Sequence, residues 1–418
     1  MAAMGQSLKN IMAWVDERLP VTETYEKHMS KYYVPNNFNF WYIFGVLSTV
    51  VLVNQILTGI WLTMDYVPTG KEAFESVQYI MRDVDFGWLI RYMHAVGASA
   101  FFFVVYLHMF RGLLYGSYKK PRELIWIFGM LIYVVLMAEG FFGYLLPWGN
   151  LAFWAAQVIV NLVGAIPFIG EGLALWVRGD FNMSGVTLNR FFALHVVLVP
   201  LLLLVLVVLH FLALHEVGSN NPEGIDIKKH TDEDGKPLDS VPFHPYYTIG
   251  HDLPGIVLFF MVLSIFIFFF PDGWGFILEH PNYTPADALK TPSDIVPTWY
   301  YTPFYAMLRS ATYPLFGLTA KFLGLLVMGG AILIPFAVPW LDKSPVRSIR
   351  YKGVASKIFL ALMVISLFIL GYLGTQKPTP RLNLVAEVCT MLYYAYFLLM
   401  PWYTKVEKTK PVPERLPG

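Results

Sequence analysis

The sequence predicts an all-α membrane protein that crosses the bilayer eight times. Of its 418 residues, 56% are hydrophobic and only 14% are charged, whereas soluble domains carry about 25% charged residues. Eight apolar stretches have about the 20 residues that an α-helix needs to cross the hydrocarbon core. They lie near residues 39–64, 88–110, 125–146, 188–213, 251–270, 319–340, 354–374 and 384–402.

Two segments between these stretches predict additional structure. An apolar piece within residues 147–187 is interrupted by proline and glycine, so we expect an interfacial or partly inserted hairpin there. The loop at 271–318 is long and rich in proline and aromatic residues, and loops of that length usually carry function. We expect two domains: residues 1–215, a four-helix bundle with the hairpin, and residues 216–418, with four further helices and the long loop.

Lysine and arginine gather after every second stretch, which predicts the orientation. They follow the second, fourth, sixth and eighth stretches as Lys119, Lys120, Arg122, Lys228, Lys229, Lys343, Arg347, Arg350, Lys352, Lys405, Lys408 and Lys410. Positive residues favour the cytoplasmic side, so we expect both termini in the cytoplasm (or a mitochondrial matrix) and the hairpin and long loop outside. The net charge of +1 and the lack of basic blocks argue against nucleic acid as a partner.

Two of the apolar stretches each carry a pair of histidines. His94 and His108 are 14 residues apart, which places them on nearly one helical face, about 21 Å apart along the axis. His195 and His210 are 15 residues apart with Pro200 between them, about 60° from whole turns. Both stretches run from outside to inside, so His94 and His195 share an outer depth, and His108 and His210 share an inner one.

Four histidines at two matched depths predict two bound haems. A lone histidine in a helix is most often a core residue with a hydrogen bond, but ionisable groups in the bilayer interior are costly and are candidates for function. Neutral imidazole is a good axial ligand for haem iron. We therefore expect two b-type haems, an outer one held by His94 and His195 and an inner one held by His108 and His210. With no CxxCH motif in the sequence, we expect both to be non-covalent.

Four glycines repeat the spacing of the histidines. Gly45 and Gly59 in the first stretch, and Gly129 and Gly143 in the third, are again 14 residues apart. A porphyrin wedged into a four-helix bundle needs flanking helices without Cβ atoms where the ring approaches. By depth, Gly45 and Gly129 match the inner haem, and Gly59 and Gly143 match the outer one. The alternative is ordinary small-residue helix packing.

Three arginines near the histidines are candidates for pairing with the carboxylates of the haem propionates. Arg91 and Arg111 lie one turn beyond His94 and His108, and Arg190 precedes His195 by five residues. An arginine fork pairs well with a carboxylate. The alternative is that these side chains reach for the membrane interface.

With these residues in view, the chain resembles the cytochrome b subunit of the cytochrome bc complex, the quinol:cytochrome c oxidoreductase or respiratory complex III, over nearly its whole length. The resemblance rests on the histidine and glycine pairs and on the motifs GYLLPWGNLAFW (143–154), RFFALH (190–195), GSNNP (218–222), FHPYYTI (243–249) and PTWY (297–300).

The resemblance implies an activity, partners and a location. Quinol would be oxidised at an outer site, with one electron passing to a Rieske iron–sulfur protein. The other would pass through a low-potential outer haem and a high-potential inner haem to quinone at an inner site, coupled to proton translocation. It also implies a c-type cytochrome subunit, membrane lipid and a dimer of the complex. We expect a bacterial plasma membrane, with a mitochondrial inner membrane as the alternative.

The resemblance also assigns residues to the two quinone sites. For the outer site it implies Tyr144, Ala155, Pro297, Thr298 and Tyr300, and for the inner site His215, Ser219 and Asp252. His215 follows His210 by five residues, about 140° further round the helix, so it points away from the iron and can exchange protons near the inner interface.

The sequence departs from the family pattern at three positions. Thr298 stands where the family usually has glutamate, and a hydroxyl cannot act as a base near neutral pH. We name Glu139, Glu279 and Asp294 as alternative proton acceptors; for Glu139 a structural hydrogen bond is an equal alternative. Ala155 stands where glycine is common, which predicts weak sensitivity to methoxyacrylate-type inhibitors. His251 stands where lysine is common, next to Asp252.

Two other classes of protein remain as alternatives. Di-haem subunits attached to dehydrogenases have fewer spans and lack the PTWY loop. A transporter with a histidine proton relay would show broken helices or repeated halves around a site at the midplane, and the two halves of this sequence share no internal likeness.

Overall fold

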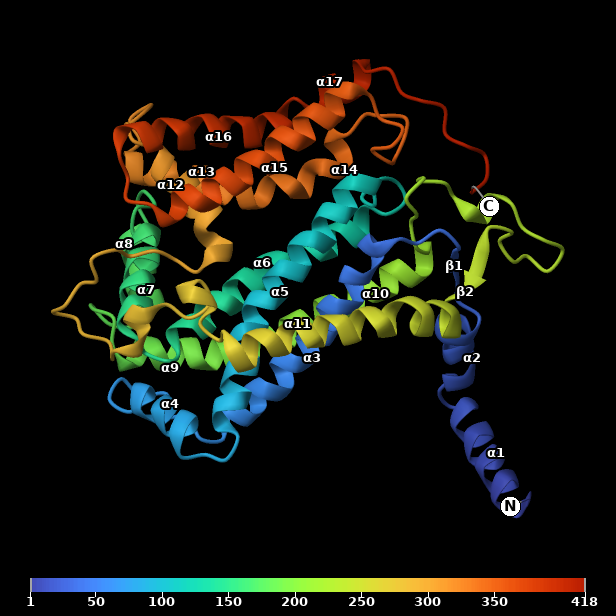
Figure 1. Cartoon of the computed structure of the whole chain (residues 1–418), viewed down its shortest axis with the longest axis horizontal. Helices are drawn as coiled ribbons and strands as arrows, with labels where there is room; N and C mark the ends of the chain where they lie inside the picture. Colours follow the sequence, from blue (N-terminus) through green and yellow to red (C-terminus); the bar gives the residue numbers. More distant parts are fainter. Residues whose placement is uncertain (1, 417–418) are drawn as a thin grey trace.

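The computed structural model describes residues 2–416 and is mostly helical (Figure 1). Within those residues, seven helical segments are long and apolar enough to cross a membrane: Phe40–Thr63, Gly87–Tyr115, Glu123–Leu145, Gly185–Val217, Phe243–Phe269, Ala320–Leu341 and Val354–Thr375. An eighth is formed if α16 (Pro380–Leu398) and α17 (Met400–Val406), bent by 57°, are counted as one span. The prediction of an all-α membrane protein is confirmed, with seven candidate spans among the described residues, or eight if the bent pair crosses as one.

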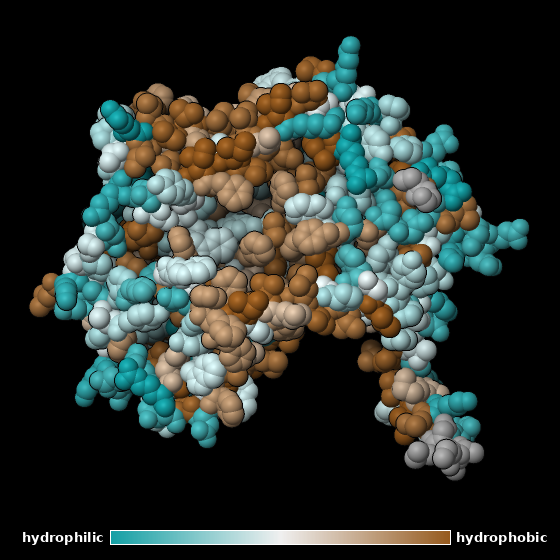
Figure 2. Space-filling view, viewed as in Figure 1, coloured by the Kyte–Doolittle hydropathy of each residue, from teal (hydrophilic) through white to brown (hydrophobic). Residues whose placement is uncertain are grey.

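The surface has the distribution of a membrane protein. Figure 2 shows apolar residues across the middle of the molecule and hydrophilic residues concentrated at its two ends. α1 (Ala2–Asp16), α2 (Val21–Tyr25) and the C-terminal tail lie at one of these ends, together with the strands β1 (Tyr33–Pro35) and β2 (Ser240–Pro242), which pair antiparallel (Figure 1). We call this the terminal end, and the other the loop end.

The first four spans pack as two pairs. α3 (Ile43–Thr63) lies against α5 (Gly87–Tyr115), and α6 (Glu123–Leu145) lies against α10 (Val199–Val217). Apolar side chains such as Val51, Phe102 and Met130 form the core between them. The glycines on α3 lie beside the histidines on α5, and those on α6 lie beside His210 on α10 and His195 in the turn that precedes it.

The fourth span contains a π-helical turn that explains the 15-residue histidine interval. α9 (Gly185–Ala193) continues through a π turn at Leu194–Leu198 into α10, and Pro200 follows at the start of α10. A proline lacks the N–H that an α-helix would bond to the carbonyl four residues earlier, which favours such a turn. The π turn holds one residue more than an α turn, so it compensates for the extra residue between His195 and His210. The angle between these two histidines then corresponds to a 14-residue interval in a regular helix.

The loop end carries the short helices. α4 (Ala73–Arg82) lies between the first two spans, and α7 (Asn150–Val163) packs on α8 (Gly170–Arg178) in the segment expected to form a hairpin. The long loop at 271–318 is not irregular throughout, because α12 (Thr302–Ser310) begins in it and packs against α13 (Ala320–Leu333), α15 (Val354–Thr375) and α16. α11 (Leu253–Phe269) and α14 (Val338–Leu341) complete the helices.

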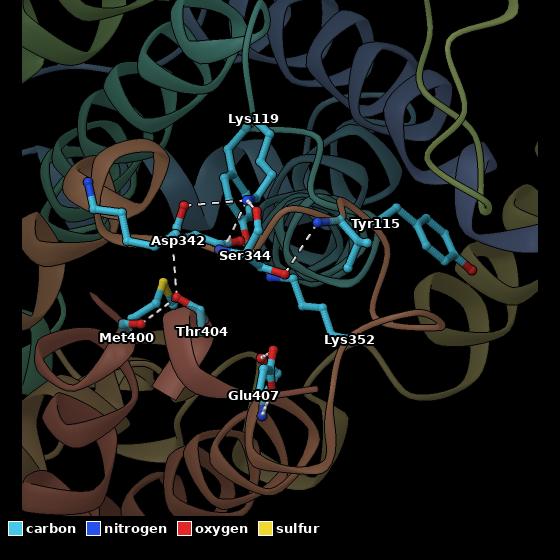
Figure 3. Close-up of polar contacts among 12 residues, drawn as sticks. Tyr115, Lys119, Asp342, Ser344, Lys352, Met400, Thr404 and Glu407 are labelled. Atoms are coloured by element: carbon cyan, nitrogen blue, oxygen red, sulfur yellow. Dashed lines mark hydrogen bonds and ion pairs between the residues drawn. The ribbon is translucent and has the colours of Figure 1, made fainter. Parts of the chain in front are cut away.

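A buried ionic cluster joins the two halves at the terminal end (Figure 3). Asp342, after α14, lies 2.5 Å from Lys352 Nζ and 3.2 Å from Lys119 Nζ, and it accepts a hydrogen bond of 2.7 Å from Tyr118. Burial by itself would raise the pKa of Asp342, but the two lysines and Tyr118 outweigh it and hold that pKa below its usual value. The carboxylate is therefore ionised and fully paired, and it ties the turn after α5 to the segment after α14.

Candidate haem and quinone sites

The two histidine pairs face each other across neighbouring helices. The ring centroids of His94 and His195 are 6.1 Å apart, and those of His108 and His210 are 6.3 Å apart. Two imidazoles that bind one metal atom from opposite sides, each at about 2 Å, need a centroid separation of about 6 Å. The geometry therefore suits a single iron between the members of each pair.

Each of the four glycines lies against one of the four histidines. A Cβ atom added to Gly45 would lie 3.2 Å from Cε1 of His108, and one added to Gly59 would lie 3.2 Å from Cε1 of His94. The corresponding distance from Gly129 to His210 is 3.4 Å, and Gly143 lies still closer to His195. The structure thus brings together the same glycines and histidines that the spacing pairs by depth, and side chains here would crowd both the imidazoles and a flat ring.

The outer pair of histidines is held in the tautomer that a metal ligand needs. The Thr58 hydroxyl donates to the carbonyl of Asn54 at 2.6 Å and lies 2.9 Å from Nδ1 of His94. Because its proton is already used, the hydroxyl accepts from His94. A proton on Nδ1 leaves the Nε2 lone pair of His94 free for a metal.

Glu139 has the same effect on His195. Nδ1 of His195 lies 3.1 Å from the Glu139 carbonyl oxygen and 3.0 Å from Oε1 of its carboxylate. Both oxygens accept, so Nδ1 carries the proton and Nε2 is free. A carboxylate behind a histidine is a common way to orient a metal ligand and to raise its basicity. This contact favours the structural alternative for Glu139 over a role as proton acceptor.

The three arginines differ in their surroundings. Arg111 lies with Nη2 3.4 Å from Nδ1 of His108 and with its guanidinium over Tyr42 at 4.9 Å. Arginine can only donate hydrogen bonds, so a hydrogen bond to Nδ1 of His108 requires that nitrogen to lack a proton. A His108 that bound iron through Nε2 would instead carry its proton on Nδ1. Arg91 is partly buried on α5, whereas Arg190 is exposed and donates to the carbonyl of Trp176 on α8.

Tyr144, one of the residues expected at the outer quinol site, contacts the long loop, which is also bonded to the hairpin. Tyr144 donates to Oε2 of Glu279 at 3.2 Å and accepts from Asn282 Nδ2 at 2.9 Å. Asn282 also donates to Oε2 of Glu279 at 3.3 Å, and its own oxygen accepts from the backbone N–H of Ala152. Burial raises the pKa of Glu279 to about 7.

The other residues expected at the outer site are partly or fully buried nearby. Tyr300 stacks on Phe102 with ring centroids 3.8 Å apart, and Thr298 is buried two residues before it, after the partly buried Pro297. Ala155 is buried in α7. Burial is the largest cause of the raised pKa of Tyr300; a hydrogen bond with Thr298 opposes it, and the charge of Glu279 adds to it. Glu279 and Tyr300 are therefore coupled electrostatically.

The residues expected at the inner quinone site form two groups at the terminal end. Tyr32 stacks on His215 with centroids 4.4 Å apart, and its hydroxyl lies 3.3 Å from that of Ser219. Asp252 is hydrogen-bonded to Nδ1 of His251 at 3.0 Å, and Nε2 of His251 lies 3.3 Å from the carbonyl of Asn39. The structure therefore links His215 to Ser219 through Tyr32, while Asp252 has His251 as its partner.

Comparisons with known proteins identify the family. A family described as "Cytochrome b/b6/petB" matches residues 29–218, and one described as "Cytochrome b(C-terminal)/b6/petD" matches residues 285–394. The chain belongs to the cytochrome b family. It is accordingly a haem-binding membrane protein of electron transport, and the expected resemblance is confirmed.

Individual members of the cytochrome b family are similar over nearly the full length. Cytochrome b of Allochromatium vinosum is 55% identical, covering 97% of this chain and 98% of its own. Cytochrome b of Rickettsia typhi is 45% identical, covering 97% of each. A solved chain of a hyperthermophilic respiratory Complex III matches with a TM-score of 0.85 and 37% identity, covering 94% of this chain and 99% of that one.

Three residues of this chain contact the candidate sites without having been named from the sequence: Thr58, Asn282 and Tyr32. His251, noted beside Asp252, is its hydrogen-bond partner. Thr58 offered a weak signal, because it directly precedes Gly59. Asn282 lies three residues after the named Glu279, whereas Tyr32 offered no signal, since it reaches His215 from a segment remote in sequence.

Proposed function

We propose that the chain is the core subunit of a quinol:cytochrome c oxidoreductase. It oxidises quinol at the loop end, transfers one electron across the membrane and reduces quinone at the terminal end, coupled to proton translocation. One observation carries this proposal: two pairs of imidazoles have ring centroids 6.1 and 6.3 Å apart, and each pair is flanked by glycines. When bound, two b-type haems would supply a one-electron path between the two ends.

The chain's own residues would hold these groups in defined positions. His94 and His195 would be the ligands at the loop end, with Thr58 and Glu139 fixing their tautomers. His108 and His210 would be the ligands at the terminal end. Arg111 would pair with an anionic substituent of the ring instead of with Nδ1 of His108. Nδ1 of His108 could then carry a proton, and Nε2 would be free to bind the iron.

Arg91 would take the same role toward a propionate near His94, because it is a partly buried cation on the same helix. Arg190 has less support, since it is exposed and bonded to the carbonyl of Trp176. Gly45, Gly59, Gly129 and Gly143 would admit the two rings.

The quinone sites lie at opposite ends of the bundle. At the loop end, Tyr144, Ala155, Pro297, Thr298 and Tyr300 would line the quinol site, because the hairpin and the long loop join there. At the terminal end, His215, Ser219 and Asp252 would bind quinone. His215 and the pair formed by Asp252 and His251 can each supply protons to a reduced quinone.

The proposal includes partners and a location. A Rieske iron–sulfur protein and a c-type cytochrome subunit would accept electrons at the loop end, within a dimeric complex in membrane lipid. The positive residues at the terminal end favour both termini in the cytoplasm of a bacterium, with the loop end outside. Residues 1–215 would form the haem domain and residues 216–418 the second membrane domain.

A rapid-mixing experiment tests this function. The purified complex, with its inner quinone site blocked by an inhibitor, is mixed with quinol in the presence of oxidised cytochrome c. We expect reduction of b-type haem within milliseconds to seconds and release of protons. A preparation that is colourless, or whose haem quinol does not reduce, would contradict the proposal and favour a transporter.

A further inference from the structure

The outer quinol site lacks the base that the motif at 297–300 usually provides. Thr298 fills that position, and an alcohol neither ionises nor accepts a proton to a useful extent near pH 7. Quinol oxidation nevertheless releases two protons for each two electrons. A different group at the loop end must therefore receive the proton that the motif does not accept.

Two of the three acids near this site have other roles. Oε1 of Glu139 lies 3.0 Å from Nδ1 of His195, so its carboxylate is committed to a candidate haem ligand. Asp294 is exposed and forms an ion pair with Lys377, whose Nζ lies 3.4 Å away. Among these three acids, Glu279 is the one whose carboxylate is hydrogen-bonded to Tyr144 in the described residues.

Glu139 also has a buried carboxylate oxygen without a hydrogen bond in the described residues, but its other oxygen contacts a candidate haem ligand, whereas Glu279 contacts Tyr144. The Oε2 atom of Glu279 accepts from Tyr144 at 3.2 Å and from Asn282 at 3.3 Å, while its Oε1 atom is sealed from solvent and makes no hydrogen bond within the described residues. Asn282 is itself held by the backbone N–H of Ala152 at 2.8 Å. One carboxylate oxygen is therefore fixed in place, and the other is left with lone pairs available to a ligand.

The surroundings of Glu279 tune its protonation. Among the described residues, Tyr144 on α6 is hydrogen-bonded to it, and the phenols of Tyr283 in the long loop and Tyr300 before α12 lie close enough for its charge to raise their pKa values. Phenols are neutral at pH 7. The adjacent His280 is turned to Asp272, 3.7 Å away. With burial dominating, the pKa of Glu279 lies at about 7, where a group can both accept and release a proton.

We propose that Glu279 is the proton acceptor of the outer quinol site, positioned by Tyr144 and Asn282, in place of the carboxylate missing at position 298. This inference rests on the proposed function. Oxidation of one quinol to quinone breaks two O–H bonds and releases two electrons and two protons. One electron and one proton go to the iron–sulfur protein, the other electron enters this chain's path across the membrane, and Glu279 takes the other proton to become a neutral carboxylic acid. Solvent at the loop end then removes it.

The test compares four variants of the whole complex: Glu279→Gln, Glu279→Asp, the double variant Glu279→Gln with Thr298→Glu, and Glu171→Gln. Glu171 is the control, because it is an exposed carboxylate on α8 at the same end. The readouts are the rate at which quinol reduces haem b with the inner site blocked, the pH dependence of that rate, and the haem content and redox spectrum of each preparation.

We expect Glu279→Gln to slow haem reduction tenfold or more at unchanged haem content, since general bases contribute about 10²- to 10⁴-fold. The wild-type rate should rise with pH through about 7, as the carboxylate forms, and this rise should be absent in Glu279→Gln. Thr298→Glu should restore most of the rate, Glu279→Asp should keep a pH-dependent rate, and Glu171→Gln should match the wild type.

A Glu279→Gln rate within twofold of the wild type, or a slow rate with the same pH rise, would overturn the assignment. If Glu279→Gln fails to assemble, a pH-independent rate in Glu279→Asp would do so instead. Failure of the proposed function looks different, because quinol would then not reduce haem b in the wild-type complex either.

Discussion

At the residue scale, the candidate haem sites depend on which atoms face Nδ1 of each histidine. The histidines and glycines could be predicted from the sequence, because a helical period converts spacing into a shared face. Their partners could not be predicted, because Thr58 and Glu139 reach the imidazoles from other helices. Glu139 is an example. From its position within a span, a role as proton acceptor and a structural hydrogen bond were equal alternatives.

Replacing Thr58 by valine tests the hydrogen bond to His94. The variant removes the oxygen that accepts from Nδ1 and leaves a side chain of similar shape. We expect tenfold or greater weakening of haem retention at the loop end, because partners of metal ligands typically contribute 10- to 100-fold to affinity.

Haem loss on dilution and a redox titration measure the effect of Thr58→Val. Thr49→Val is the matched control, because the Thr49 hydroxyl on the same helix donates to the carbonyl of Gly45. Equal haem retention in both variants would contradict a role for Thr58.

Ala155 gives a prediction about inhibitors. It is buried in α7, and its methyl group occupies space that a glycine would leave open. We expect the wild-type complex to resist methoxyacrylate-type inhibitors and Ala155→Gly to be inhibited at tenfold or more lower concentration. Inhibitor titration of quinol oxidation measures this, and potent inhibition of the wild type would refute the prediction.

At the element scale, hydropathy predicted the spans well, because length and composition alone decide whether a helix can cross a bilayer. Two features could not be predicted from the sequence. The π turn at Leu194–Leu198 depends on local hydrogen bonding, and α12 lies in a segment that was expected to be a long loop. Pro303 instead occupies the first turn of α12, where a proline is well tolerated.

The π turn predicts different outcomes for two deletions in the fourth span. Deleting Val197 should remove the extra residue, leaving a regular helix in which His195 and His210 are 14 residues apart and still face the same way. Deleting Leu204 from the regular part of α10 should turn the two histidines about 100° relative to each other.

Haem quantitation in purified complexes distinguishes the two deletions. We expect two haems per chain without Val197 and fewer than two without Leu204. If the variant lacking Val197 lost a haem while the one lacking Leu204 kept both, the role given to the π turn would be wrong.

At the scale of the whole molecule, the two halves are held together at the terminal end by the cluster around Asp342. The positions of Lys119 and Lys352 in the sequence predicted an orientation in the membrane. They did not predict that these two lysines, 233 residues apart, both contact the carboxylate of Asp342. Contacts of such long range depend on how the helices pack, which a pattern along one chain does not encode.

Asp342→Asn should destabilise this junction. Removing one partner from a buried ion pair leaves uncompensated charge and costs about 3–5 kcal/mol. We expect a clearly lower unfolding temperature of the purified complex, and proteolysis in the loop between α14 and α15. Asp234→Asn, at an exposed turn, is the control.

Because the pKa of Asp342 is lowered in the folded state, its stabilising contribution is present near neutral pH and is lost in acid as the carboxylate takes up a proton.

The central claim is that two imidazole pairs each hold one haem, and haem quantitation with redox titration of the purified complex tests it most directly. The account predicts two b-type haems per chain with two distinct midpoint potentials, and loss of the haem at the loop end alone in His195→Asn. One haem per chain in the wild type, or two undisturbed haems in His195→Asn, would contradict it.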